Sequence, residues 1–383
     1  MKIDFKNKNL VFSFICIIFM AILLIMPTGF EKQMYVNAES VKAKVLATNE
    51  STVYNNGLLK QGSQVCEVEL LNGSFKGEVV EAVNFLTGKL EFDKIFQVGD
   101  RALVLVEKSN EGELVFVNML DHYRVNVEWF IIIVFMIALL VFSGTTGIRT
   151  IISFIFSLLA IWKVLIPMLL KGYQPMIVGL IIGLTMATVT LILVGGFTKK
   201  AYCAIGGTVV ASLLTCLMAM GFGVLFKVDG TVMAWSESLL YAGFEGLNLT
   251  QIYQAAIYLS CSGAIVDLAM DLAAALEEVV EKKPDLSGKE IWLSGMKIGR
   301  SVVGSQVTTL LLAYMGSFIG VMMVYMAQGT PMISILNSKS IASEILHTFV
   351  GCIGLVIVSP ITTTICSYVY KKKEDCAIIT FNE

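Results

Sequence analysis

The chain has 383 residues, of which 56% are hydrophobic and only 15% are charged, and its formal net charge is −2. Soluble globular domains contain about 25% charged residues, so this composition favours a membrane protein. It excludes disordered and collagen-like chains, and the absence of any basic block longer than three residues argues against nucleic-acid binding. The eight cysteines are scattered and lie mostly inside apolar runs, which is not the pattern of a disulfide scaffold.

A helix needs roughly 20 apolar residues to cross the hydrocarbon core of a bilayer. The sequence predicts a membrane all-α bundle of about eight such helices. The predicted spans are Leu10–Met26, Trp129–Phe142, Thr150–Leu170, Met176–Val194, Ala201–Phe226, Ile252–Leu276, Val302–Met326 and Ile341–Ile365.

The positions of Lys and Arg predict how the spans are oriented, because cytoplasmic loops carry an excess of both. With the N-terminus inside, fourteen basic residues fall on the cytoplasmic side: Lys2, Lys6, Lys8, Arg149, Lys199, Lys200, Lys282, Lys283, Lys289, Lys297, Arg300 and Lys371–Lys373. Only Lys171, Lys227 and Lys339 fall in the short outer loops. Both termini are therefore expected in the cytoplasm, with residues 31–124 outside.

The first apolar run has two interpretations. A basic start, an apolar core and a Val36-Asn37-Ala38 site are typical of a cleaved signal peptide. That site lies twelve residues beyond Met26, which is far for signal peptidase, so a retained transmembrane helix is favoured. Either way, the segment that follows is expected outside.

Residues 31–124 have a different pattern, with short β-rich stretches separated by turn signals. Five strands in this length suit a small closed barrel of the OB type, and a sandwich-like meander is the alternative. Cys66 is the only cysteine of this segment, so no disulfide within it is expected. A rigid cap is favoured over a ligand-binding domain. The predicted strands are Val41–Ala47, Val65–Leu70, Val79–Val83, Ala102–Val106 and Leu114–Asn118.

Several local motifs resemble the YibE/F family of bacterial multi-pass membrane proteins. They are Pro27-Thr28-Gly29-Phe30-Glu31, Ser262-Gly263-Ala264, Asp267-Leu268-Ala269-Met270-Asp271, Ala274-Ala275-Leu276-Glu277-Glu278-Val279, Ala327-Gln328-Gly329-Thr330-Pro331 and Glu344-Ile345-Leu346-His347-Thr348. The resemblance extends from about Pro27 to Pro360 and implies a bacterial plasma-membrane protein with an outer domain. The resemblance brings no established activity and no site residues. The apolar and β-rich patterns themselves predict an N-terminal helix at 1–30, a β domain at 31–124, a seven-helix domain at 125–370 and a cytoplasmic tail at 371–383.

Ionisable residues inside predicted spans cost about 2.5–3.5 kcal/mol each on insertion scales, so each one is a candidate functional residue. Asp267 and Asp271 lie one turn apart on one face of the sixth span. We expect one of them to face the bundle interior near Arg300, which begins the seventh span, with Gln306 deeper in that span. The alternative is that the sixth span ends early and continues as a solvated acidic helix.

A second layer of candidates lies toward the outer surface. Glu344 and His347 share one face at the start of the eighth span, where they either form part of a polar path or solvate the helix entrance. Histidine titrates near neutral pH and recurs in proton relays. Lys163, late in the third span, is expected to snorkel toward the surface.

No enzyme signature is present: the sequence contains no HExxH, GxSxG, paired Cys-x-x-Cys or Walker motif. With only His122 and His347, a His-rich metal centre is excluded, and no cofactor is expected. A permease or secondary transporter using intramembrane carboxylates is the favoured function, because an anchor needs only one span. The alternatives are a non-transporting component whose outer domain binds a partner, and an intramembrane enzyme. The expected partners are the lipid bilayer and a membrane protein or second copy.

Overall fold

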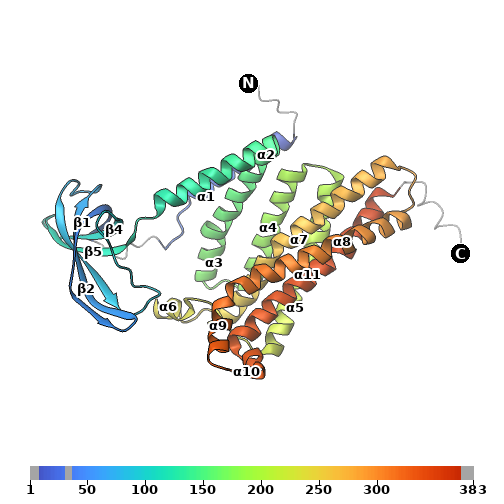
Figure 1. Cartoon of the computed structure of the whole chain (residues 1–383). Helices are drawn as coiled ribbons and strands as arrows, with labels where there is room; N and C mark the ends of the chain where they lie inside the picture. Colours follow the sequence, from blue (N-terminus) through green and yellow to red (C-terminus); the bar gives the residue numbers. More distant parts are fainter. Residues whose placement is uncertain (1–7, 31–36, 372–383) are drawn as a thin grey trace. The chain divides into compact units, whose positions relative to one another are not determined.

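The computed structural model describes residues 8–30 and 37–371 of the chain (Figure 1). These residues fall into two compact units, each with its own core. Among the described residues, one unit consists of residues 37–141 and contains all the strands, and the other consists of residues 8–30 and 142–371 and is helical. The boundary between them falls inside a helix.

The strand unit is a closed five-stranded barrel, as the alternating sequence pattern predicted. Its strands follow the order β1-β2-β3-β5-β4, with β4 closing back onto β1. All neighbours are antiparallel except β3 and β5, which pair in parallel at Val83 and Asn118. The strands are β1 (Ala38–Asn56), β2 (Leu59–Leu70), β3 (Val79–Thr87), β4 (Arg101–Lys108) and β5 (Leu114–His122).

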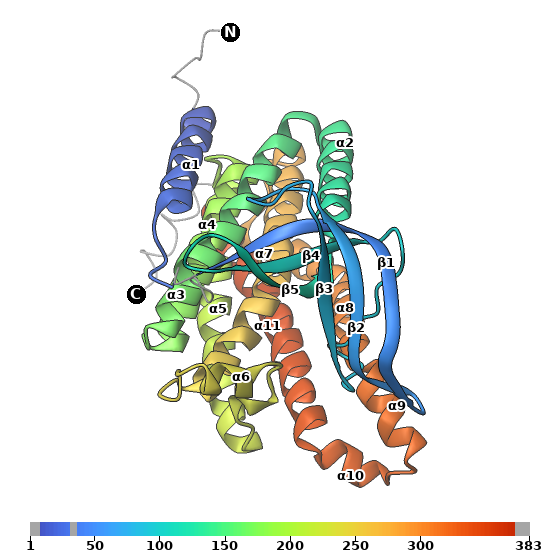
Figure 2. The same ribbon diagram turned by 90° about the vertical axis from the view of Figure 1, so that its left-hand side faces the viewer.

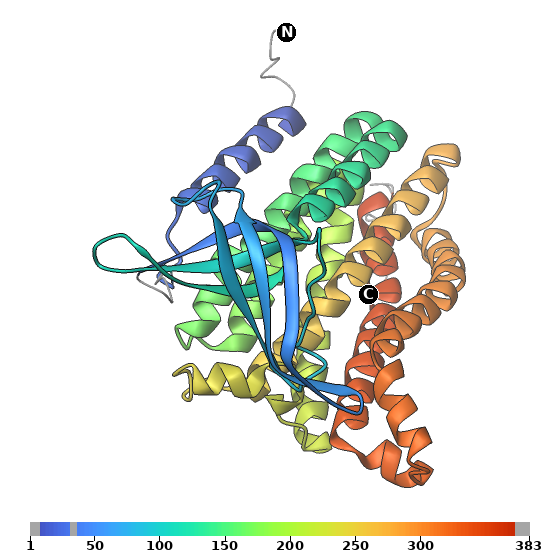
Figure 3. The same cartoon turned by 60° about the vertical axis from the view of Figure 1, so that its left-hand side comes forward.

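The barrel core is filled by every second side chain of each strand. Val41, Ala43 and Val45 of β1 are almost fully buried, and so are Cys66 and Val68 of β2. Burial raises the pKa of the Cys66 thiol to about 11, so this thiol is protonated at neutral pH. The hairpin of β1 and β2 extends from this core as a long two-stranded ribbon, which Figures 2 and 3 show from two sides.

An ion pair across the barrel yields a prediction about pH. The Nζ atom of Lys108 lies 2.7 Å from an oxygen of Glu39, which also accepts a hydrogen bond from Ser74. These contacts lower the pKa of Glu39 below its usual value of 4.5, so its stabilising contribution is present above that pH and is lost as the pH falls below it. Glu39→Gln should therefore cost up to about 1 kcal/mol at pH 7 and less at lower pH, measured by thermal unfolding of the full chain.

The exposed Glu113 provides the matched control for this prediction. Glu113→Gln should leave unfolding nearly unchanged from pH 7 to pH 4. A difference between Glu39→Gln and the natural protein that stays constant over this range would contradict the prediction.

The helical unit contains long apolar helices joined by short loops and short helices. The long helices are α1 (Lys8–Ile25), α2 (Val125–Leu159), α4 (Pro175–Gly195), α5 (Lys199–Phe226), α7 (Leu249–Lys282), α8 (Gly288–Ser317) and α11 (Lys339–Tyr370). The shorter elements are η1 (Ala160–Leu165), α3 (Ile166–Leu170), η2 (Gly230–Val232), α6 (Ser236–Tyr241), α9 (Ile319–Ala327) and α10 (Met332–Asn337). Ser287 and Glu290 form the capping box that opens α8.

Within the described residues, six helices are long and apolar enough to cross a membrane, or seven if the bent pair α8–α9 is one span. The prediction of eight differs because the second and third predicted spans form one helical run from Val125 to Leu170. That run is broken at Gly144, whose φ of 54° is rare for residues with a side chain. The last turn before α3 is the π-helix η1. Eight separate spans therefore remain a prediction.

The central helix of the bundle is α7, which packs against α4, α5, α8 and α11. Figures 1 and 3 show α8 (orange) running beside α11 (red), and the contacts of α8 are mainly with that helix. The largest buried cluster includes Ile265, Leu268 and Leu272 of α7 with Leu355 of α11. The face that α7 turns to its neighbours is thus apolar.

Close helix contacts are made where a glycine of one helix meets a polar side chain of the next. A Cβ atom on Gly207 of α5 would lie 2.0 Å from the Thr362 hydroxyl of α11, and one on Gly299 of α8 would lie 2.0 Å from that of Ser359. Gly354 of α11 faces Thr215 of α5 in the same way. Small residues allow membrane helices to approach this closely, so glycine position determines which helices are neighbours.

Candidate functional site

Helices α7, α8 and α11 bring four polar side chains together, and Ser260 is the central one. The Ser260 hydroxyl is hydrogen-bonded to Nε2 of His347 and accepts a hydrogen bond of 3.3 Å from the Tyr314 hydroxyl. The rings of Tyr314 and His347 stack with their centroids 4.3 Å apart. Nδ1 of His347 lies 3.9 Å from a carboxylate oxygen of Glu344. Sequence reasoning found Glu344 and His347, and the structure adds Ser260 and Tyr314.

One assignment of the protons satisfies all the hydrogen bonds of this cluster. Ser260 donates its own hydrogen to the carbonyl of Ile257 at 2.9 Å, so it accepts from both Tyr314 and His347. In the assignment that satisfies all three contacts, Nε2 of His347 donates to Ser260 and Nδ1 faces Glu344. The pair can take up one further proton, shared between the ring and the carboxylate. Such a group is suited to carrying a proton within an apolar bundle.

Packing holds this pair in place on α11. Glu344 is only 7% exposed, and the neighbouring carbonyl of Ser343 accepts a hydrogen bond of 2.6 Å from Tyr253 of α7. Gly351, one turn further along, lets Tyr314 and Cys261 approach the α11 backbone. The cluster thus lies at a close junction of three helices.

The sequence pattern of α7 also leaves one face of this helix uncovered. The exposed positions are spaced by three or four residues, which places them in a single stripe. They contain small or acidic side chains and no large apolar one: Ala256, Ser260, Gly263, Asp267 and Asp271. Ser260 belongs to both this stripe and the cluster with His347. The two predicted layers of polar residues are therefore connected along one helix face.

The expectation that Asp267 or Asp271 faces the bundle interior near Arg300 is wrong. Asp267, Asp271 and Arg300 are all exposed, and within the described part of the chain neither aspartate forms an ion pair. The reason is the packing of α8, whose Gly295 and Gly299 fit into the groove between α7 and α11. This packing directs Arg300 away from the interior.

The other sequence candidates have clear positions. The Oε1 atom of Gln306 is buried and has no hydrogen-bond partner among the described residues, so a polar group is available inside α8. Lys163, expected to snorkel, donates a hydrogen bond of 3.1 Å to the carbonyl of Met26, just past the end of α1. Its ammonium group thus satisfies a carbonyl at a helix end.

Two family models match the chain. One, described as YibE/F-like protein, matches residues 131–372, and the other, the YibE/F family N-terminal domain, matches residues 33–121. The chain belongs to the YibE/F family. Neither the curated proteins nor the solved structures contain a match.

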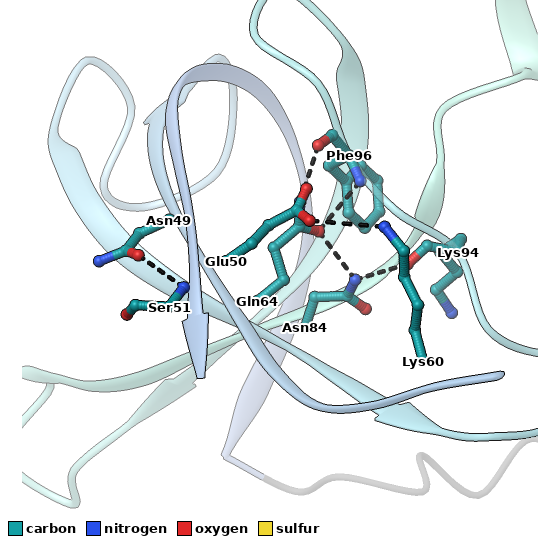
Figure 4. Close-up of polar contacts among 8 residues, drawn as sticks. All are labelled: Asn49, Glu50, Ser51, Lys60, Gln64, Asn84, Lys94 and Phe96. Atoms are coloured by element: carbon teal, nitrogen blue, oxygen red, sulfur yellow. Dashed lines mark hydrogen bonds and ion pairs between the residues drawn. The ribbon is translucent and has the colours of Figure 1, made fainter. Parts of the chain in front are cut away.

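The barrel of this YibE/F protein holds a second polar network, which the sequence did not reveal. Gln64 and Asn84, opposite each other on β2 and β3, are at most 1% exposed (Figure 4). The Gln64 amide donates to the carbonyl of Phe96 at 2.8 Å and accepts from its N–H at 3.0 Å. Asn84 donates to Gln64 and to the carbonyl of Lys94. These amides hold the loop between β3 and β4 against the barrel, so their role is structural.

Proposed function

We propose that this YibE/F protein is a proton-coupled secondary transporter of the bacterial plasma membrane, with both termini in the cytoplasm and the barrel outside. The polar stripe of α7 carries the proposal. It runs from the cluster at Ser260 to Asp271, eleven residues or about 16 Å along the helix axis. Polar side chains exposed on a membrane helix are costly in lipid, so such a stripe is expected to face water or a solute.

Each group has a role in this proposal. Glu344 and His347 take up one proton from the outer side, and Asp267 and Asp271 carry charge toward the cytoplasmic side. Transfer between the two layers requires water or a helix movement, because Ser260 and Asp267 are about two turns apart. The buried oxygen of Gln306 is a further group that a moving solute could contact.

The experiment compares metabolite and ion uptake in cells that lack the gene and are complemented with variants. Asp267→Asn and Glu344→Gln remove a titratable group with little change in size and should lower uptake at least about tenfold. Glu281→Gln, at an exposed position near the end of the same helix, is the matched control and should stay close to the natural protein. Membrane protein levels are measured in parallel.

Two outcomes would contradict transport. The first is an identical uptake profile in cells with and without the gene. The second is full activity of both carboxamide variants, because the proposed path would then lack its titratable groups.

A second candidate function is recognition of a partner by the barrel. A surface hollow of about 400 Å³ lies on β1, β2 and β3, and in it Glu67 and Glu81 are directly opposite each other. Like charges in this register are unfavourable unless a cation or a basic group lies between them. If this function is the right one, Glu67→Gln with Glu81→Gln should impair the complemented cells while Asp267→Asn does not.

A further inference from the structure

An apolar groove of about 520 Å³ lies between α1, the run formed by α2, η1 and α3, and α4. Its floor consists of buried side chains from the cluster that joins these helices, among them Phe156, Ala160 and Ile182. Its rim includes Phe19 of α1 and Ile181 of α4, which are about half exposed. Figure 2 shows α1 beside α4. The groove is therefore open to the surroundings of the bundle.

The length of the groove matches the thickness of one membrane leaflet. On α4 it is lined from Gln174 to Thr185, and on the facing run from Phe156 to Met168, which is about 16–18 Å along the helices. The hydrocarbon core of a bilayer is about 30 Å thick, so one leaflet supplies about 15 Å. A volume of about 520 Å³ spread over this length gives a mean width of about 6 Å, which is too narrow for a helix about 10–12 Å across. A single extended hydrocarbon chain fits it.

The two ends of the groove differ in polarity. Tyr173 and Gln174 line one end, next to the turn between α3 and α4. Thr185 is the polar side chain that lines the other end, and its hydroxyl already donates a hydrogen bond of 2.8 Å to the carbonyl of Ile181. The lining between the two ends is aliphatic and aromatic. This arrangement suits a molecule that has a polar group at one end and a hydrocarbon tail.

Two lysines lie at the polar end of the groove. Lys171 is exposed in the turn before Tyr173, and a Cβ atom on Gly29 would lie 4.0 Å from its Nζ atom. Lys163 donates its hydrogen bond to the carbonyl of Met26, in the same segment beyond α1. Within the described part of the chain, neither ammonium group forms an ion pair. Their positive charge complements an anionic headgroup.

We propose that this groove binds one acyl chain of an anionic phospholipid, with the phosphate of the headgroup beside Lys171 and Lys163. An unfilled apolar groove loses dispersion contacts along its whole lining, and a hydrocarbon chain restores them. The second chain of the lipid stays in the bilayer. The site requires only that the helices lie in a membrane, and it does not depend on the proposed transport, because none of its lining residues belongs to α7.

The first test is lipid retention by the purified full chain in detergent, measured by native mass spectrometry. Phosphatidylglycerol and phosphatidylcholine with the same acyl chains are supplied at equal concentration. The natural protein should retain one phosphatidylglycerol per chain, with a preference of at least about tenfold, and Lys171→Gln should reduce that preference about fivefold. Lys227→Gln, which removes the lysine that follows α5, is the matched control and should leave the preference unchanged. Equal retention of the two lipids by the natural protein, or equal losses in the two variants, would overturn the proposal.

A second variant tests the position of the acyl chain. Ile181 is exposed on the rim, so the larger ring of Ile181→Trp should occupy part of the groove without disturbing the buried core. Retention of phosphatidylglycerol should fall at least about tenfold, because the chain loses its contacts with the lining. Leu158→Trp adds the same ring at an exposed position of α2 that does not line the groove, and it should retain the lipid normally. Normal retention by Ile181→Trp would overturn the proposal.

A third measurement uses the natural protein and keeps the test decisive if the variants fail to fold. Phosphatidylglycerol with a diazirine near the end of one acyl chain is cross-linked to the full chain in a bilayer. The label should concentrate on residues 177–185 of α4, at the far end of the groove. A second apolar groove, of about 380 Å³, lies along residues 214–225 of α5 and serves as the internal comparison. Equal labelling of both grooves would show unspecific contact with bilayer lipid and would overturn the proposal.

Discussion

Gly207→Ala is expected to destabilise the helical unit by about 1–3 kcal/mol, through overpacking between α5 and α11. The new Cβ would lie 2.0 Å from Oγ1, 3.0 Å from Cβ and 3.2 Å from Cα of Thr362. A β-branched residue in a helix has little rotamer freedom, and its Cα cannot turn away, so the two helices must separate. In thermal unfolding of the full chain in detergent, the midpoint should fall by several degrees.

The same helix supplies the matched control. Gly221 has no atom within 4 Å of the position where a Cβ would be added. Gly221→Ala should therefore leave the midpoint unchanged or raise it, because alanine is the better helix former by up to about 1 kcal/mol. Equal effects of the two substitutions on the unfolding midpoint would show that helix propensity, and not the contact with Thr362, determines the change in stability.

Gln64→Leu is expected to have the largest effect in the barrel. It should lower the free energy of unfolding by roughly 2–5 kcal/mol. Its amide satisfies both the N–H and the carbonyl of Phe96 inside the core. Leucine fills a similar volume but leaves both backbone groups buried without a partner, and each unsatisfied group costs about 1–3 kcal/mol. Hydrogen–deuterium exchange of the full chain should show much faster exchange in the loop between β3 and β4.

Gln97→Leu tests whether this effect is specific, because Gln97 follows Phe96 in the same loop but its side chain is exposed. Its exchange should match that of the natural protein. If Gln64→Leu also left the loop protected, the amide network of Figure 4 would not be what holds this segment.

The strands of the barrel could be predicted because inward and outward residues alternate clearly. All five predicted strands are present, but β1 extends to Asn56, well beyond the predicted end at Ala47. The additional residues are mostly exposed in the ribbon with β2. They therefore lack the alternation of apolar and polar residues from which a strand is predicted. Gln64 and Asn84 were not anticipated either, because polar residues in a strand are ordinarily assigned to the outer face.

The helices could be predicted from their apolar runs, but which helices pack against one another could not. Sequence spacing places Asp267 and Asp271 on one face of α7 without telling whether another helix covers that face. The outcome depended on α8, whose Gly295 and Gly299 pack against both α7 and α11 and leave the stripe of α7 uncovered. Ser260 and Tyr314 were overlooked for a related reason: each is ordinary in a membrane helix, and only the meeting of three helices joins them to His347.

The π turn η1 is the place where the long helical run of Val125–Leu170 can lose one residue without changing the rest of the bundle. A π turn contains one residue more than the α-helical turn that it replaces. Losing one residue between Ala160 and Leu165 would restore a regular helix and keep Phe156 and Leu165 on the buried side. A deletion elsewhere in the bundle would instead rotate all later side chains by about 100°. Natural relatives with one residue fewer in this helix are therefore expected to have their gap at η1, where the fold already accommodates a variable length.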